Sequence, residues 1–173
     1  MSNALLVGII GSLILVTGAA WPEPKKIIHP ARSIKNWLFA VGALFLFVYA
    51  WLGYIAGGSF FFVLLELLVI IASILMLTHV RDSIAAPIIL NLGLLFILYS
   101  ISQSQGFDMI FFILGLSGIA LGYIFDMNTL RRALALTIGS SLIVIFSYLE
   151  ANWIFFWINV FFAVFSGYYG LRK

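Results

Sequence analysis

The sequence contains no cysteine, and only 9% of its 173 residues are charged, whereas a soluble domain has about 25% charged residues. The missing cysteine excludes a disulfide framework, a thiolate metal site and a cysteine nucleophile. The low charge, together with a hydrophobic fraction of 64%, excludes an ordinary soluble protein, because a domain of this size buries only about 70% of the surface that its unfolded chain exposes. We therefore expect an all-α integral membrane protein.

Catalytic and metal-binding patterns are also missing from the sequence. His29 and His79 lie far apart along the chain, and neither has a second ligand at metal-binding spacing. The sequence has no glycine-rich phosphate loop and no serine-nucleophile motif, and its few acidic residues are scattered. We expect no enzyme activity, no metal, no cofactor and no nucleic-acid partner.

Long apolar runs fill most of the chain, and a helix needs about 20 such residues to cross a bilayer. The prolines after Trp21 end the first run. The next run, from Asn36 to Val80, has a single charge and is too long for one crossing, so we place a turn at the glycines of residues 53–59. Seven transmembrane helices are predicted, at residues 4–20, 37–52, 59–78, 84–102, 107–125, 133–149 and 153–170.

The lysines and arginines predict the orientation of these helices. With seven crossings, the loops after the first, third and fifth helices and the C-terminus lie on one side of the membrane. That side receives all nine basic residues: Lys25, Lys26, Arg32, Lys35, Arg81, Arg131, Arg132, Arg172 and Lys173. Basic loops face the cytoplasm, so we expect the N-terminus outside and the C-terminus inside. The lipid bilayer is the expected partner, and a bacterial inner (plasma) membrane is the expected location.

Three predicted helices recur in the second half of the chain. Residues 8–11 (GIIG) are similar to residues 115–118 (GLSG), and the second and sixth helices share a glycine, Gly42 and Gly139. Residues 60–66 of the third helix align with residues 153–159 of the seventh. An odd number of crossings followed by one linker helix gives both repeats the same orientation. We expect two parallel triple-helix bundles, at residues 1–80 and 107–173, joined by a linker helix within residues 81–106.

This layout of three, one and three helices resembles the SWEET sugar transporters and the wider PQ-loop (MtN3/saliva) superfamily. The Pro22-Glu23-Pro24 segment and the basic loop after it resemble the Pro-Gln turn of that family, with glutamate in place of glutamine. The stretch from Trp51 to Tyr54 resembles the aromatic end of the family's second helix. Asn159 resembles an asparagine that faces the solute cavity, and Glu66 replaces its counterpart in the first repeat.

The resemblance implies a small secondary transporter or facilitator that moves a sugar-like or vitamin-like solute by alternating access. Pro22 and Pro24 would then be hinges, since proline removes a backbone hydrogen bond. Homo-oligomers are common in the resembled family, although no motif in this chain requires one.

Glu66 is the sharpest chemical signal, because a charged side chain inside a membrane helix costs about 2.5 to 3.5 kcal/mol on insertion scales. Such a carboxylate can accept hydrogen bonds from a solute or carry a coupling proton. The alternative is a structural role, in which a protonated Glu66 bonds to Asn159, Asn91 or a tyrosine and holds helices together.

Asn159 and three aromatic residues complete the predicted solute-binding set with Glu66. Trp51, Trp157 and Tyr148 could stack on a sugar or a nucleobase, although aromatic residues near helix ends often anchor a protein at the membrane interface. Two functions therefore stay open: a transporter of a small polar solute, or a non-transporting membrane protein that binds lipid or scaffolds a partner.

Overall fold

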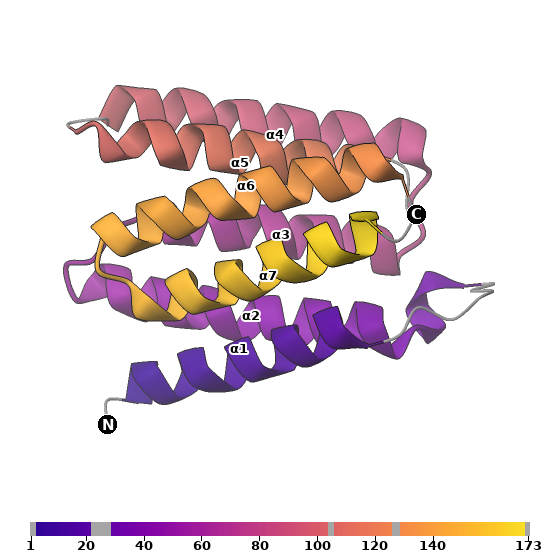
Figure 1. Ribbon diagram of the computed structural model, residues 1–173, viewed down its shortest axis with the longest axis horizontal. Helices are drawn as coiled ribbons and strands as arrows, with labels where there is room; N and C mark the ends of the chain where they lie inside the picture. Colours follow the sequence, from indigo (N-terminus) through magenta and orange to yellow (C-terminus); the bar gives the residue numbers. More distant parts are fainter. Residues whose placement is uncertain (1–2, 22–28, 104–105, 126–128, 172–173) are drawn as a thin grey trace. The chain divides into compact units, whose positions relative to one another are not determined.

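The computed structural model describes residues 3–21, 29–103, 106–125 and 129–171, and all regular structure in these ranges is helical (Figure 1). The predicted all-α class is confirmed, and each predicted helix has an observed counterpart with similar bounds. The elements are α1 (Asn3–Ala20), the short 3-10 helix η1 (Pro30–Arg32), α2 (Ile34–Ile55), α3 (Phe61–Leu77), α4 (Asp82–Gln103), α5 (Asp108–Ile124), α6 (Leu130–Leu149) and α7 (Trp153–Leu171).

Four helices in the described ranges are long and apolar enough to cross a membrane. These are α1, α2, α4 (over Ser83–Gln103) and α6. Helices α3 and α5 have 17 residues each, and α7 has an apolar stretch from Trp153 to Tyr168. The three shorter helices occupy the third place of the first repeat and the first and third places of the second.

The chain forms two compact units, Met1–Arg81 and Asp82–Lys173. In the first unit, α2 packs against both α1 and α3. In the second unit, α5 packs against α4 and α6, and α6 packs against α7. Each helix thus packs mainly on its neighbours in the chain, as a row of hairpins. Short connections make consecutive helices antiparallel neighbours.

Glycines lie at close helix contacts in both units. A Cβ atom on Gly11 of α1 would lie 3.2 Å from the carbonyl oxygen of Gly42, and a Cβ atom on Gly115 of α5 would lie 3.0 Å from the carbonyl oxygen of Gly139. Gly118 also approaches the same backbone, since its Cβ atom would lie 2.8 Å from the Cα atom of Gly139. The alignment of residues 8–11 with residues 115–118 stays a prediction, because glycines at helical spacing allow either register.

The middle helices of the two predicted repeats, α2 and α6, begin and end in the same way. Ser33 caps α2 and Thr129 caps α6, each through a side-chain oxygen that accepts a hydrogen bond from the N–H three residues later. Helices α2, α3 and α6 end in Schellman turns with a left-handed residue: Gly57 (φ 92°), His79 (φ 54°) and Ala151 (φ 53°). These turns reverse the chain within a few residues and so place consecutive helices side by side.

Candidate functional site

Glu66 lies inside α3 and is only 4% exposed. Its Oε2 atom is buried and has no hydrogen-bond partner among the described residues. The neighbouring buried residues of the helix are apolar, among them Phe62 and Leu65. A carboxyl oxygen in such surroundings is energetically unfavourable unless it gains a proton, a solute donor or another polar partner.

Several other polar side chains in the helices form local hydrogen bonds. Asn91 and Asn159 each donate an Nδ2 hydrogen bond to the carbonyl oxygen four residues earlier, at 2.8 Å and 2.9 Å. Ser100 and Ser117 donate from their hydroxyl groups in the same way, at 2.7 Å each. An ionised carboxylate has no donor, so Glu66 cannot close this local bond while charged. Three hydroxyl groups of the helices also bury an oxygen atom with no partner among the described residues: Ser12, Thr137 and Ser147. A hydroxyl group can donate to a carbonyl oxygen of its own helix, whereas a carboxylate cannot.

Asn159, which the sequence aligns with Glu66, lies inside α7. It is 6% exposed, and its amide donates to the carbonyl oxygen of Phe155. In α7, Phe155, Ile158 and Asn159 are buried; in α3, the residues with the same spacing, Phe62, Leu65 and Glu66, are buried too. Burial does not select one register, because every residue of α3 from 62 to 66 is buried, so the equivalence of the two polar residues stays a prediction.

The three aromatic residues of the predicted solute site are exposed. Trp51 is 45% exposed and lies in a ring cluster with Phe47 and Tyr54 at the end of α2, with centroid distances of 6.4 and 6.0 Å. Aromatic rings this exposed at a helix end can anchor a protein at the membrane interface as readily as they can line a cavity.

Tyr148 and Trp157 are 58% and 56% exposed and share a second ring cluster, at the turn between α6 and α7. Phe156 connects them, with centroid distances of 6.1 Å to Tyr148 and 5.1 Å to Trp157. The structure thus brings two of the five predicted solute-binding residues into one cluster, and it is a surface cluster within the second unit.

The remaining predictions concern residues outside this site. Pro22 and Pro24, the predicted hinges, lie outside the described residues. Over the part of the chain that is described, no group of three or more histidine or acidic residues has a geometry that could hold a metal ion.

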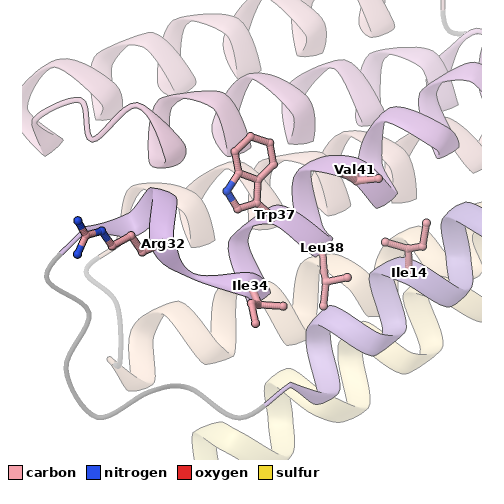
Figure 2. A pocket seen from close by; sticks show the side chains of 6 residues that line it. All are labelled: Ile14, Arg32, Ile34, Trp37, Leu38 and Val41. Atoms are coloured by element: carbon pink, nitrogen blue, oxygen red, sulfur yellow. The ribbon is translucent and has the colours of Figure 1, made fainter.

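The first unit has an apolar groove of about 280 Å³ between α1 and the start of α2, which no sequence motif predicted. Figure 2 shows its lining, which comes from Ile14, Arg32, Ile34, Trp37, Leu38 and Val41. The sequence signal for it is weak, because only the packing of α1 on α2 brings Ile14 beside Leu38 and Val41. The sequence indicates the groove only through Arg32, a cation just before the apolar start of α2 at Ile34.

Comparisons of the chain with protein-family models, curated proteins and solved structures found no match.

Proposed function

We propose that this chain is a membrane transporter of a small polar solute, and that Glu66 is the group that binds the solute or its coupled proton. The observation that carries the proposal is the buried Oε2 atom of Glu66, which has no hydrogen-bond partner among the described residues. Ionisable residues inside membrane helices generally mark solute, ion or proton pathways.

The proposal includes seven crossings with the N-terminus outside. Helices α3 and α5, with 17 residues each, are about 25 Å long, at the lower end of what spans a bilayer core. A small local thinning of the bilayer accommodates such a length at modest free-energy cost. The distribution of the basic residues supports this count, because losing any one crossing would scatter them over both sides.

Glu66 suits solutes that carry hydroxyl or N–H groups. A carboxylate offers two acceptor oxygens, and a protonated carboxyl offers one donor. Asn159, at the position predicted to be equivalent in the second repeat, supports such chemistry. Its side-chain amide donates a local hydrogen bond to the carbonyl oxygen of Phe155. The amide can exchange this bond for one to a solute without breaking the backbone hydrogen bonds of the helix. Sugar-like and vitamin-like molecules fit this requirement.

The second candidate is a non-transporting protein that binds lipid or scaffolds a partner through its helices. The exposure of Trp51, Trp157 and Tyr148 favours it, because exposed aromatic rings at helix ends are typical of interface anchoring. In this function the buried polar residues would only fix the packing of the helices.

Thermal unfolding of the purified full-length protein separates the two functions. We expect one class in a panel of sugars, nucleosides, vitamins and amino acids to raise Tm, because a ligand at 100 times its Kd stabilises the folded state by about 2.7 kcal/mol. Glu66→Gln and Asn159→Ala should lose this response. Ser73→Ala is the matched control, since Ser73 is a buried polar residue of the same helix, about 10 Å further along α3.

If the protein is a transporter, we expect Ser73→Ala to show the same ligand-induced rise in Tm as the wild type. If no soluble compound raises Tm, or if Glu66→Gln responds as the wild type does, Glu66 does not bind the solute and the scaffold function takes its place.

A further inference from the structure

The groove in the first unit combines an apolar floor with a cation at one end. Its exposed lining is almost entirely carbon, and the guanidinium of Arg32 lies beyond one end of this apolar surface (Figure 2). Figure 2 shows Arg32 at one end and Ile14 and Val41 at the other. The lining residues of α2 run from Ile34 to Val41, which corresponds to about 10 Å of helix. An apolar chain lying in this groove would therefore contact hydrocarbon along its length and have a cation beyond the Arg32 end.

One wall of the groove is fixed before any ligand binds. The Nε1 atom of Trp37 donates a 2.8 Å hydrogen bond to the carbonyl oxygen of Ala31 in η1, which holds the indole ring beside the groove. Because that donor is already used, the ring offers an apolar surface. Ile34 and Trp37 are more than half exposed, so the groove opens sideways from the helices.

The groove lies at the basic end of the first unit. The rings of His29, just before η1, and His79, just after α3, are 6.4 Å apart, so the region around η1 and the end of α3 lie together. Arg81 follows His79 and is exposed. In the sequence, Lys25 and Lys26 belong to the same loop as His29. A basic residue near the membrane surface that contacts an anionic headgroup favours that lipid about fivefold.

We propose that this groove is a binding site for an anionic phospholipid, with the phosphate on Arg32 and the start of an acyl chain along Ile34, Leu38 and Val41. A small polar solute does not fit this surface, because the apolar lining offers it no hydrogen bonds. A lipid fits both parts, since its phosphate pairs with a guanidinium and its chain covers apolar surface exposed sideways. The site is separate from Glu66 and does not depend on transport.

Native mass spectrometry of the full-length protein, with dioleoyl phosphatidylglycerol or phosphatidylcholine added to the detergent, tests the proposal. We expect wild type to bind phosphatidylglycerol about fivefold more than phosphatidylcholine. Arg32→Gln should remove most of this preference, whereas Arg81→Gln, which removes a cation at the same end but outside the groove, should keep it.

Filling the groove tests its apolar part. Val41→Trp should lower the bound fraction of phosphatidylglycerol severalfold, and Ile74→Trp, at an exposed position of α3 in the same unit, should leave it unchanged. Equal losses in Arg32→Gln and Arg81→Gln would show diffuse attraction to the basic end and overturn the site. Full binding in Val41→Trp would equally overturn it, since the acyl chain would then lie elsewhere.

Discussion

A Cβ atom on Gly139 of α6 would lie 2.9 Å from the carbonyl oxygen of Gly115 in α5, so these two helices meet backbone to backbone. In the first unit, Gly42 of α2 approaches α1 in the same way, and its Cβ would lie 3.0 Å from the backbone nitrogen of Leu15. Lipid tails are as apolar as leucine, so helices in a bilayer associate largely through close van der Waals packing at small residues. These glycine contacts are therefore the main packing points within each repeat.

Gly139→Ala should destabilise the protein. The added methyl group would lie 2.7 Å from the backbone nitrogen of Ile119, and backbone atoms cannot move aside as a flexible side chain can. Overpacking of this kind costs about 1 to 3 kcal/mol. Gly53→Ala is the control, because a Cβ atom there has no neighbour within 4 Å, and alanine favours a helix over glycine by about 0.5 to 1 kcal/mol. Thermal unfolding should show a lower Tm for the first variant and an equal or higher Tm for the second. Equal shifts would contradict the close contact of α5 and α6.

The sequence was sufficient to predict the helices but not the packing between them. Proline, glycine and polar clusters interrupt the apolar runs clearly, so the helix bounds agree with the prediction within a few residues. The register of α1 against α2 depends on which glycine meets the opposing backbone, and Gly8 and Gly11 look alike in a sequence. The left-handed residues His79 and Ala151 could not be predicted because neither is glycine.

The candidate site was predictable only in part, for a related reason. An acid inside an apolar helix is visible in the sequence, which made Glu66 a candidate directly. The exposure of an aromatic ring is not visible in the sequence. Trp51 and Tyr148 suit a cavity and a membrane interface equally well until their surroundings are known. The lipid groove needs residues from two helices, and no single segment contains its pattern.

Ala151→Gly should stabilise the protein. Ala151 adopts a left-handed conformation at the end of α6 (φ 53°), which costs a residue other than glycine about 1 to 2 kcal/mol. Glycine removes this strain but gains entropy in the unfolded chain, so we expect a net gain of about 0.5 to 1 kcal/mol. Ala56→Gly is the matched control, because Ala56 ends α2 with an ordinary φ of −82°. Scanning calorimetry should show a gain for Ala151→Gly alone; a gain of the same size in both variants would rule out backbone strain as its cause.

Glu66→Leu should raise the stability of the folded protein while removing solute binding. Leucine eliminates a buried carboxyl oxygen that has no partner among the described residues, and an unsatisfied buried polar group costs about 1 to 3 kcal/mol. Each kcal/mol corresponds to about 2 to 4 °C in Tm for a chain of this size. Glu66→Gln keeps a polar group and should gain less. A fall in Tm for Glu66→Leu would mean that the carboxyl group makes a stabilising bond between helices, in agreement with the structural role.

Single cysteines can map the crossings directly, because the sequence has no cysteine of its own. Seven crossings place residues 58, 103 and 150 outside and residues 79 and 129 inside. A membrane-impermeant maleimide applied to intact cells should therefore label Gly58→Cys, Gln103→Cys and Glu150→Cys. His79→Cys and Thr129→Cys should react only after the membrane is permeabilised.

The residues beside α3 and α5 decide between seven crossings and four. If only α1, α2, α4 and α6 crossed the membrane, the residues after α3 would lie outside and those after α4 would lie inside. His79→Cys would then be labelled in intact cells, and Gln103→Cys would be protected. Both outcomes are the reverse of the seven-crossing prediction, and Gly58→Cys is labelled in either arrangement, which makes it the positive control. Labelling of Gln103→Cys with protection of His79→Cys would place Glu66 in a helix that crosses the bilayer, where a carboxylate can serve transport. The reverse pattern would place Glu66 in a helix that does not cross, and the proposed transport function would lose its physical basis.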